Sequence, residues 1–406
     1  MRYVIIGVGA AGITAAKTIR ACEADADIVM ISQDNYVHSR CMLHRFISGE
    51  RTEDGLNFAG EDFFEKNNIY WIKDTIVTRV DTKEKEVYLQ DQRIAYDKLL
   101  IATGANSFMP PVGDFRTADN VFGLRHLSDA QNICNAIKEN AKVLVVGSGL
   151  VGLDAAYALL ERKLDVTVVE MAERILPIQL DDTAAKAYQD LFEEAGCKFY
   201  LGRKASETVL DKDNNIEAVI LDDGTKIACD VIIVAAGVRP AIACVEESGI
   251  QAERFIEVNE YMETSASGVY AAGDVTGRSG IWPNAQKQGQ TAGYNMCGIK
   301  TQYLDTYAMK NTINFYGLAT LSLGRGQVQE GDKVVVCEDS KEYKKAIIRA
   351  GKLDSITLQG DMDYSGIYQY LIKNQIALPE NGKDVFHLSF ADFYGVEADG
   401  QYTYSL

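Results

Sequence analysis

The chain has 406 residues, of which 47% are hydrophobic and 24% are charged. This composition is typical of globular proteins and excludes a disordered chain, and the length is sufficient for two to four domains. The formal net charge of −17 repels phosphodiester backbones. We therefore expect no nucleic-acid partner, although backbone amides and helix N-termini can still bind a nucleotide cofactor.

The eight cysteines are scattered along the chain and include no CxxC pair. Neither a zinc site nor a thioredoxin-type dithiol is therefore expected, and we predict no metal site. Unpaired cysteines fit a reducing compartment, so we expect a cytoplasmic protein. The apolar segments 1–14 and 143–160 lack the features of a signal peptide or a membrane span, and no membrane association is predicted.

The first predicted unit begins with a short β-branched run at residues 3–6. A glycine-rich GxGxxG turn follows, formed by Gly7, Gly9 and Gly12, and then come a helical pattern and a second strand-like run at 27–31. In such a turn the first glycine allows the tight bend, the second lets the backbone approach a pyrophosphate, and the third lets the helix pack closely on the strand. The segment predicts a dinucleotide-binding unit.

The same order recurs in the middle of the chain. A strand-like run at 142–146 leads into Gly147, Gly149 and Gly152, and a helical pattern and another strand-like run at 165–169 follow. A single GxGxxG turn is weak evidence, but two of them in the same strand–turn–helix context indicate an internal duplication. The sequence therefore predicts two dinucleotide-binding domains.

Each copy is followed by a matching strand that ends in glycine. The first of these strands leads into Ala102, Thr103 and Gly104, and the second leads into Gly237. The intervals between each glycine turn and its matching strand are similar in length, which supports the duplication.

The last part of the chain reads differently. A further strand-like signature ends at Gly273 and Asp274. Beyond it, strand-like runs at 346–349 and 355–358 flank Gly351, and a helical pattern follows. This order predicts a small α+β domain at the C-terminus.

An acidic residue at the end of the second strand of such a unit usually binds a ribose hydroxyl. In the second copy this residue is Glu170, whose carboxylate would repel the 2′-phosphate of NADPH, so NADH is favoured over NADPH. In the first copy the aligned position is Ser32, and the nearest acid is Asp34. We assign Asp34 to the adenosine ribose, with a solvated loop aspartate as the alternative.

Over essentially its full length, the chain resembles the FAD-dependent pyridine nucleotide-disulfide oxidoreductases. The resemblance rests on the two GxGxxG units, the two strands that end in glycine and the late Ala-Ala-Gly-Asp sequence. The resemblance implies an α/β fold with two Rossmann-like domains of the three-layer ββα type and a small C-terminal α+β domain. It implies that the first unit binds FAD and the second NAD(P)H. The expected domains are an FAD-binding domain at 1–112 and 241–305, an NAD(H)-binding domain at 113–240, and an interface-like domain at 306–406.

The resemblance also implies roles for particular residues. Asp274 corresponds to the family aspartate that hydrogen-bonds the flavin ribityl chain, and the segment from Trp282 to Ala285 looks like the one that flanks the flavin ring. Arg40 and Leu43 match the Arg-x-x-Leu pattern of rubredoxin reductases, ferredoxin-type reductases and the flavin module of nitrite reductases. The residues predicted to contact FAD are Gly7, Gly9, Gly12, Asp34, Arg40, Ala102, Thr103, Gly104, Gly273, Asp274, Trp282 and Ala285. Those predicted to contact NADH are Gly147, Gly149, Gly152, Glu170 and Gly237.

Cys41 is a candidate catalytic residue in the same segment. Disulfide reductases of the family carry CxxxxC here, and this chain does not. NADH oxidases and coenzyme A-disulfide reductases carry one cysteine, which Cys41 misses by one position. A redox-active thiol must ionise near the flavin, and Arg40, His44 and Arg45 supply positive charge nearby. An inert cysteine is the alternative.

Arg45 and Asp154 are the other catalytic candidates. In the ferredoxin-reductase relatives a lysine after the Arg-x-x-Leu segment pairs with a glutamate on the helix of the NAD domain, beside flavin N5. Arg45 and Asp154 occupy the matching positions, and an acid within an apolar helix is costly without a partner. We expect this pair to orient the nicotinamide, with a purely structural interdomain salt bridge as the alternative.

These features predict an FAD-dependent NAD(P)H oxidoreductase that passes hydride from NADH to flavin and then electrons to a small acceptor, with a rubredoxin-like carrier favoured. The alternatives are an NADH oxidase or coenzyme A-disulfide reductase using Cys41, and a non-catalytic dinucleotide-binding subunit of a redox complex. A homodimer and a subunit of a larger complex are both open. An acidic carrier would need a basic patch, and the candidates for it are Lys341, Lys344, Lys345, Arg349 and Lys352.

Overall fold

The computed structural model describes residues 1–305, 310–324, 326–339, 341–379 and 382–404. Within these ranges no helix is long and apolar enough to cross a membrane. No group of three or more His, Cys, Asp or Glu side chains in the same ranges could hold a metal ion.

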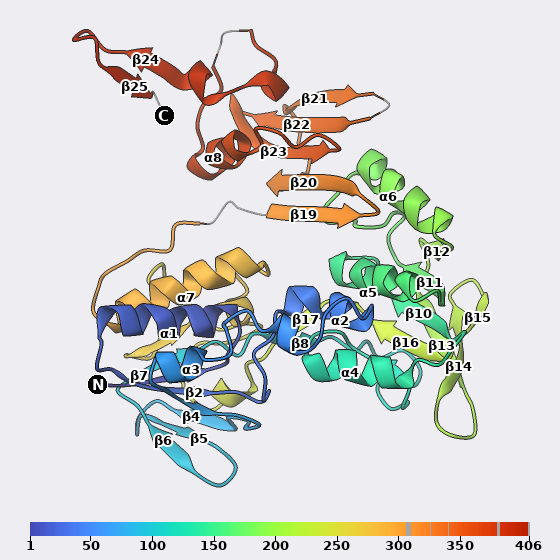
Figure 1. The fold of residues 1–406 in the computed structure, drawn as a ribbon, viewed down its shortest axis with the longest axis horizontal. Coiled ribbons are helices and arrows are strands. Elements are labelled where there is room, and N and C mark those ends of the chain that lie inside the picture. The colour runs from blue at the N-terminus through green and yellow to red at the C-terminus, as the bar shows by residue number, and fades with distance from the viewer. Residues whose placement is uncertain (306–309, 325, 340, 380–381, 405–406) are drawn as a thin grey trace. The chain divides into compact units, whose positions relative to one another are not determined.

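The chain divides into two compact units. The first comprises Met1–Met171 and Gly196–Leu304, and the second comprises Ala172–Ala195 and Asp305–Leu406. Figure 1 shows the elements of each unit by label. Both dinucleotide-binding copies fall in the first unit.

The first copy is built on a five-stranded parallel sheet of order β18-β7-β1-β2-β3. Its strands are β1 (Arg2–Ile6), β2 (Asp27–Ile31), β3 (Ile69–Ile72), β7 (Lys98–Ile101) and β18 (Val269–Ala271). Helices α1 (Ala10–Cys22) and α7 (Trp282–Met296) pack against each other on this sheet. A small antiparallel sheet is formed by β4 (Arg79–Asp81), β5 (Glu86–Tyr88) and β6 (Arg93–Ala95).

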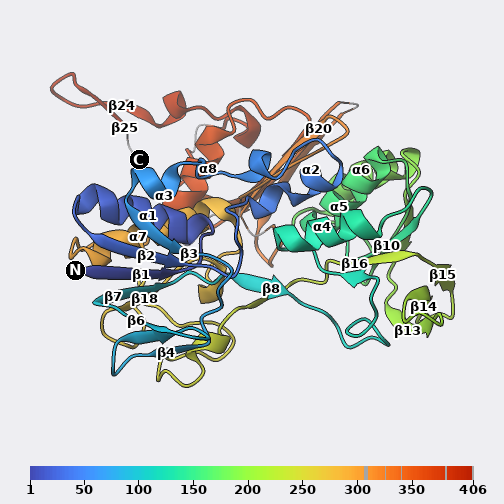
Figure 2. The ribbon, with the colours of Figure 1, turned by 60° about the horizontal axis from the view of Figure 1, so that its bottom comes forward.

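The alternation of side chains along β1 explains why three layers form. Tyr3 and Ile5 point to one face and pack with residues of α1 and α7, whereas Val4 and Ile6 point to the other and pack with Val80 and Val87 of the small sheet. Figures 1 and 2 both show the helices on one side of the parallel strands and β4 on the other. Each face of the strand is therefore buried, as its continuous apolar sequence requires.

The second copy repeats this plan. Its parallel sheet has the order β12-β11-β10-β16-β9, so β10, β11 and β16 take the places of β1, β2 and β7. The bounds are β9 (Val121–Phe122), β10 (Lys142–Val146), β11 (Asp165–Glu170), β12 (Lys198–Leu201) and β16 (Val231–Val234). The accompanying antiparallel sheet is β13 (Ala205–Leu210), β14 (Ile216–Leu221) and β15 (Lys226–Ala228), and the helices are α4 (Leu127–Ala136) and α5 (Leu150–Glu161). The predicted fold of two Rossmann-like domains is confirmed.

Two antiparallel strands connect the copies. Strand β8 (Ala105–Ser107) leaves the first sheet and pairs with β17 (Val238–Pro240), which returns from the second. The short helices α2 (Leu43–Ile47) and α3 (Phe63–Lys66) complete the first copy, and α2 contacts both α4 and α5 of the second. The segment that carries Cys41 therefore lies between the two copies.

The second unit contains a five-stranded antiparallel sheet of order β19-β20-β23-β22-β21. Its elements are β19 (Lys310–Phe315), β20 (Leu318–Gly324), β21 (Lys333–Glu338), β22 (Tyr343–Arg349), β23 (Lys352–Gln359), α8 (Gly366–Asn374), β24 (Tyr394–Val396) and β25 (Tyr402–Tyr404). Leu371 and Ile372 of α8 pack on Ile356 and Leu358 of β23 in its core. The strands predicted around Gly351 form the hairpin of β22 and β23.

Helix α6 (Asp182–Glu194) belongs to the second unit, whereas the sequence places it in the NAD(H)-binding domain of residues 113–240. Its buried face explains the difference. The Tyr188 hydroxyl lies 2.8 Å from the carbonyl oxygen of Leu318 and 2.9 Å from Thr320 Oγ1, and Phe192 packs edge-on against Phe315. The boundary drawn from the sequence therefore differs from the structural division at residues 172–195.

Candidate functional site

The two glycine turns have the same backbone geometry. Gly7 and Gly147 begin them with φ angles of +111° and +103°, a region that favours glycine. A Cβ on Gly12 would lie 2.0 Å from the carbonyl oxygen of Gly7, and one on Gly152 would lie 1.9 Å from that of Gly147. The first and third glycines are thus required by the fold, because any side chain there would collide with the backbone.

A cavity of about 360 Å³ opens at the carboxyl ends of β1, β2 and β7. Open α/β sheets bind their ligands at this edge. We call this cavity the larger cavity, to distinguish it from a second one described below. The residues predicted to contact FAD that line it are Gly7, Gly9, Asp34, Arg40, Ala102 and Thr103. The Thr103 hydroxyl donates to the carbonyl oxygen of Ala241 at 2.7 Å, which ties the end of the first sheet to the strand returning from the second.

A smaller cavity of about 80 Å³ adjoins the larger one, because Gly9, Arg40 and Ala102 line both. The predicted residues around the smaller cavity are Gly9, Arg40, Cys41, Ala102, Gly104, Gly273, Asp274, Trp282 and Ala285. The Phe58 ring packs edge-on against the Trp282 ring with centroids 4.6 Å apart. Apart from Gly12, which packs beneath the turn, every residue predicted to contact FAD lines one of these two cavities.

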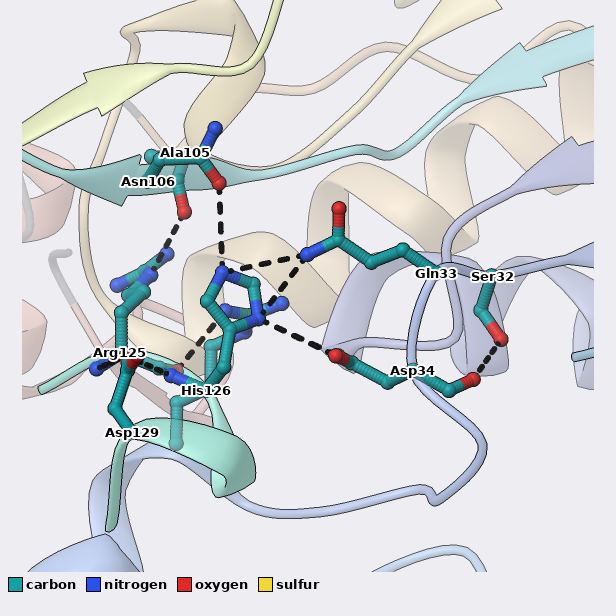
Figure 3. Close-up of polar contacts among 9 residues, drawn as sticks. Ser32, Gln33, Asp34, Ala105, Asn106, Arg125, His126 and Asp129 are labelled. Atoms are coloured by element: carbon teal, nitrogen blue, oxygen red, sulfur yellow. Dashed lines mark hydrogen bonds and ion pairs between the residues drawn. The ribbon is translucent and has the colours of Figure 1, made fainter. Parts of the chain in front are cut away.

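Two residues that the sequence did not single out, Arg125 and His126, join the parts of this site. Arg125 forms an ion pair with Asp274, and its Nε donates to the carbonyl oxygen of Ala105 at 3.1 Å. Arg40 donates in turn to the carbonyl oxygen of Arg125 at 3.1 Å. The segment just before α4, which follows β9 of the second sheet, thus reaches the cavities of the first sheet (Figure 3).

His126 occupies the N-cap of α4 and contacts three side chains of the larger cavity (Figure 3). Its ring nitrogens lie 3.4 Å from a carboxylate oxygen of Asp34, 3.3 Å from Gln33 Nε2 and 3.4 Å from Asn106 Oδ1. The Asp129 carboxylate accepts from the backbone N–H of His126 at 2.8 Å and fixes the start of the helix. Nothing in the sequence pattern predicts the direction of this imidazole; only Asp129 at the third helical position signals that a helix begins here.

The electrostatics of the larger cavity favour an anionic ligand close to Arg40. Burial and, to a lesser extent, the neighbouring Arg125 guanidinium lower the pKa of Arg40 to about 10. Burial alone would raise the pKa of Asp34, but the hydrogen bond from His126 and its positive charge hold this pKa below the ordinary value. Asp34 therefore stays ionised, and the charges of Asp34, Asp274 and Asp129 offset part of the repulsion between Arg40 and Arg125.

The second copy places its strand-end acid differently. The Glu170 carboxylate ends β11 and accepts from the backbone N–H of Ser148 at 2.8 Å and from its hydroxyl at 2.9 Å. Glu170 thus caps the second glycine turn itself. In the first turn the place of Ser148 is taken by Val8, so no equivalent side-chain bond can form.

The predicted pairing of Arg45 with Asp154 is wrong in this structure. Arg45 forms its ion pair with Glu50, five residues further along its own segment, and the nearest basic group to Asp154 is His44, whose Nδ1 lies 3.7 Å from Oδ2. Burial lowers the pKa of His44 to about 4, so this histidine is neutral at neutral pH. Burial raises the pKa of Asp154 to about 7, and Arg45 offsets only part of that rise.

Cys41 lines the smaller cavity but its surroundings do not activate it. Burial raises the pKa of the Cys41 thiol, and the negative charges of Asp154 and Asp274 add to the rise, whereas Arg125 and Arg40 oppose it. A reactive cysteine needs a lowered pKa. The electrostatics therefore favour a neutral thiol in this position.

Three features of the cavities fit FAD. Apart from the adjoining backbone, no atom of the described residues lies within 4 Å of the place that a Cβ on Gly9 would take, so the middle of the turn is open to a pyrophosphate. Arg40 and Arg125 supply two cations on the same wall. His38 is 5% exposed and lines the larger cavity, yet neither ring nitrogen has a hydrogen-bond partner among the described residues. Each feature is one that a bound dinucleotide would satisfy.

The predicted basic patch lies in the second unit and is largely neutralised. Lys345 Nζ lies 2.8 Å from Asp181, and Lys344 Nζ lies 2.8 Å from Glu342. Arg349 is held by two aspartates at 2.7 and 2.8 Å. Ion pairs within the unit therefore already engage the charges of these three residues, and a docking role of the patch stays a prediction.

Two parallel sheets with matched glycine turns, together with adjoining cavities lined by arginine and aspartate, define a protein that binds two dinucleotides. Residues 1–289 match the family described as pyridine nucleotide-disulphide oxidoreductase, and the chain belongs to this family. It is therefore an FAD-dependent NAD(P)H oxidoreductase.

Relatives of known name include an NADH oxidase from Methanocaldococcus jannaschii, which is 38% identical over 324 residues that cover 75% of this chain and 71% of the relative. The nitrite reductase [NAD(P)H] of Bacillus subtilis is 29% identical over 94% of this chain, which spans only 48% of that relative's length. The crystal structure of NADH:rubredoxin oxidoreductase from Clostridium acetobutylicum has a TM-score of 0.77 and 27% identity, and covers 95% of this chain and 98% of its own. The similarity thus extends beyond the two dinucleotide-binding copies.

Proposed function

We propose that this chain transfers hydride from NADH to FAD and delivers the electrons singly to a small redox protein of the rubredoxin type. The observation that carries the proposal is the pair of matched glycine turns, the first of which lies beside a cavity lined by Arg40, Arg125 and Asp274. The similarity to an NADH-rubredoxin oxidoreductase from Clostridium acetobutylicum, over 89% of this chain and 91% of that protein, supports the choice of acceptor.

The first copy supplies the groups for FAD. We assign Arg40 and Arg125 to the pyrophosphate, because both line the smaller cavity together with Gly9 of the open turn. We assign Asp274 to the hydroxyls of the ribityl chain, with Arg125 fixing its carboxylate. When bound, the flavin supplies the ability to accept a hydride and to release the two electrons one at a time.

The second copy supplies the groups for NADH. The open middle glycine, Gly149, and the N-terminus of α5 can receive the pyrophosphate. Glu170 is held against the turn by Ser148, with its carboxylate at the end of β11. A fixed carboxylate there accepts ribose hydroxyls and repels a 2′-phosphate, which is the basis for preferring NADH over NADPH.

Asp154 and His44 can hold a proton between the two copies. The pKa of Asp154 lies at about 7, so its carboxyl group is part protonated near neutral pH. His44 is neutral and lies 3.7 Å away. We assign to Asp154 a positioning role toward the nicotinamide, which does not require the direct ion pair with Arg45.

A second candidate function is that of an NADH oxidase or coenzyme A-disulfide reductase that uses Cys41. The observations that favour it are the position of Cys41 in the wall of the smaller cavity and the 38% identity to a relative named NADH oxidase. The raised pKa of the thiol argues against it.

One experiment separates the two functions. The purified protein is loaded with FAD, reduced anaerobically with NADH, and then mixed in turn with rubredoxin, oxygen and coenzyme A disulfide while the flavin absorbance near 450 nm is followed. The proposal predicts fastest reoxidation by rubredoxin, with equal rates for the wild type and Cys41→Ser. Reoxidation by oxygen or coenzyme A disulfide that is lost in Cys41→Ser would establish the second function instead.

A further inference from the structure

Helices α1 and α7 lie side by side and touch along one line of residues (Figures 1 and 2). A Cβ on Gly289 would lie 2.1 Å from the carbonyl oxygen of Ala11, and a Cβ on Gly293 would lie 2.9 Å from Cβ of Thr18. Residues three or four positions apart share one face of a helix. The contact line therefore continues to position 297 on α7 and to position 22 on α1.

Both helices carry a cysteine where this contact line ends. Cys22 is the last residue of α1, and Cys297 is the C-cap of α7, where its backbone N–H donates to the carbonyl oxygen of Gly293 at 3.2 Å. Both cysteines are free thiols and half-buried, and their two thiol groups interact with each other. The close approach of the two backbones thus brings together two thiols from opposite ends of the sequence of the first unit.

Strand β1 fixes this end of both helices. The Tyr3 hydroxyl donates to Oε1 of Glu23, the residue after Cys22, at 2.7 Å. Tyr3 is fully buried, and the same hydroxyl interacts with the Cys297 thiol. A disulfide requires that the backbones of its two cysteines lie close together and that their side chains point toward each other. Cys22 and Cys297 are held in this way by ordered elements on three sides.

We propose that Cys22 and Cys297 form a site of reversible oxidation, at which a small disulfide converts the two thiols into a bond that links α1 to α7. The bond would close a loop that contains most of the first unit. Closing a long loop lowers the entropy of the unfolded chain and thereby stabilises the folded protein. The site goes beyond the hydride transfer proposed above, because neither cysteine lines the larger or the smaller cavity.

The oxidation proceeds by two thiol–disulfide exchanges. The Cys22 thiolate attacks one sulfur of the small disulfide, which breaks its S–S bond, forms a mixed disulfide and releases one small thiolate. The Cys297 thiolate then attacks the Cys22 sulfur, which forms the Cys22–Cys297 bond and releases the second small thiolate. The two protons that the protein loses pass to the released thiolates, so two protein thiols are oxidised while one small disulfide is reduced to two thiols.

The order of the two exchanges follows from burial. Burial raises the pKa of the Cys297 thiol to about 12, so little of its thiolate is present near neutral pH. Cys297 therefore reacts only with a sulfur that is already beside it, and its attack is the slow step. We expect the mixed disulfide on Cys22 to precede the link.

The link bears on cofactor retention because both helices begin at the smaller cavity. Ala10 and Ala11 of α1 and Trp282 and Ala285 of α7 line its wall. Separation of the two helices would open this wall, and a bond between their C-terminal ends restrains the separation. We therefore expect the linked protein to hold FAD to a higher temperature than the protein with free thiols.

The first test is mass spectrometry of the full-length, FAD-loaded protein after incubation with oxidised glutathione. We expect a disulfide-linked pair of peptides that contain Cys22 and Cys297, and its disappearance after treatment with dithiothreitol. Cys134→Ser is the matched control, because it removes another half-buried cysteine of the same unit and should keep the linked pair. Glutathione attached to Cys22 or Cys297 in the wild type, without any linked pair, would overturn the proposal.

Single substitutions trap the first exchange. In Cys297→Ser the mixed disulfide cannot be resolved, so glutathione should accumulate on Cys22. In Cys22→Ser no neighbouring sulfur is activated, so Cys297 should stay unmodified over the same period. Equal accumulation of glutathione in the two variants would contradict the assigned order of attack.

The second test is the temperature at which the FAD-loaded protein releases its cofactor, followed by flavin fluorescence during heating. The oxidised wild type should release FAD at least about 5 °C above the reduced wild type. Cys134→Ser should show the same difference, whereas Cys22→Ser and Cys297→Ser should show none. A linked wild type that releases FAD at the same or a lower temperature than the reduced protein would overturn the stabilising role of the bond.

Each protein is compared with itself in two redox states, so a loss of stability caused by a substitution does not affect the result. Cys22→Ala and Cys297→Ala repeat the comparison with a side chain that buries no hydroxyl. If both of these variants kept the full difference in release temperature, the difference would have another source and the proposal would fail.

Discussion

The two glycine turns share a backbone but differ in how their strand-end side chains are used. In the second copy Glu170 bonds directly to Ser148 and caps its own turn. In the first copy Ser32 bonds to Trp71, and the carboxylate is supplied by Asp34 with support from His126. The backbone geometry of a dinucleotide turn is therefore fixed by glycine, whereas the polar groups that choose the ligand vary between copies.

The difference extends to the surrounding walls. Two cavities open beside the first turn; Arg40 lines both of them, and Arg125 lines the smaller one. Around the first turn the side chains come from both copies, since Arg125 and His126 follow β9 of the second sheet.

The largest effects are expected for Gly12→Ala and Gly152→Ala. The added methyl would lie about 2 Å from a backbone carbonyl oxygen in each turn, and overpacking of this kind costs roughly 1–3 kcal/mol of stability. Gly12→Ala should lose FAD during purification, whereas Gly152→Ala should retain FAD but show at least a tenfold loss of reduction by NADH. The flavin content and the rate of absorbance loss near 450 nm measure both.

Gly366→Ala is the control for this pair, because its backbone is helical and no described residue outside its own helix comes within 4 Å of the added methyl. Equal loss of FAD in Gly12→Ala and Gly152→Ala would contradict the separate roles of the two turns.

Much of the fold could be predicted from the sequence, because the signals are local. The GxGxxG turns, the apolar runs beside them and the strand ending before Asp274 each arise from short-range pattern, and the structure arranges them in two sheets of matching order. The grouping of helix α6 with the second unit depends on contacts of the opposite kind. Its contacts to Leu318 and Thr320 involve residues about 130 positions away, which no local pattern reports.

The site was predictable to the same extent. The residues predicted from the glycine motifs and from Asp274 gather around the two cavities, but Arg125 and His126 lie in a connecting loop without a motif. The pairing of Arg45 with Asp154 failed because Glu50 is nearer to Arg45 along its own segment. Side-chain direction in loops depends on tertiary contacts, which the sequence does not display.

The second glycines of the two turns, Gly9 and Gly149, allow a comparison of ligand binding in which folding should not be disturbed. In the part of the chain that the structure describes, only adjoining backbone comes within 4 Å of a methyl added to Gly9 or Gly149, so Gly9→Ala and Gly149→Ala should both fold normally. The methyl would instead occupy the place of the ligand pyrophosphate. We expect Gly9→Ala to bind FAD about tenfold more weakly and Gly149→Ala to bind NADH about tenfold more weakly, from the loss of a close phosphate contact.

Thermal unfolding of the apoproteins provides the control for these variants. If either variant lost affinity for FAD and for NADH to the same extent, the two turns would not act independently.

The role of Glu170 can be tested by changing nucleotide preference. In Glu170→Gln the repulsion of a 2′-phosphate is removed while a hydrogen-bond acceptor remains, so the ratio of kcat/KM for NADPH over NADH should rise about tenfold. Glu173→Gln, a nearby exposed acid, should leave the ratio unchanged. A ratio that does not move in Glu170→Gln would remove Glu170 from nucleotide selection and leave it only as the cap of Ser148.

Asp154 provides a pH test of the region between the copies. Burial raises its pKa from 3.8 to about 7, so the folded protein binds a proton that the unfolded chain releases, and stability should fall as pH rises from about 4 to 7. Asp154→Asn removes this penalty and should be more stable than wild type at pH 8 by about 1–2 kcal/mol, but not at pH 4.

Denaturant unfolding at both pH values, without NADH, checks this effect of Asp154. The exposed Asp91→Asn is the control. If the wild type and Asp154→Asn were equally stable at pH 8, the pKa of the Asp154 carboxyl group would not be raised.

The smallest effect is expected for Cys41→Ser. Because the pKa of the thiol is raised, little thiolate is present to react at neutral pH. The rate of electron delivery to rubredoxin should change less than twofold in steady-state assays. If this rate fell more than tenfold in Cys41→Ser, Cys41 would have to carry electrons. The protein would then work like the members of the family that use a redox-active cysteine.

The most direct test of the account is an anaerobic titration of FAD-loaded wild type and Gly149→Ala with NADH, followed at 450 nm. The account predicts that one equivalent of NADH bleaches the flavin of the wild type. In Gly149→Ala, bound FAD should remain at wild-type occupancy and bleaching should require about tenfold more NADH. Identical titration curves for the two proteins, or loss of FAD from Gly149→Ala, would contradict the assignment of FAD to the first turn and NADH to the second.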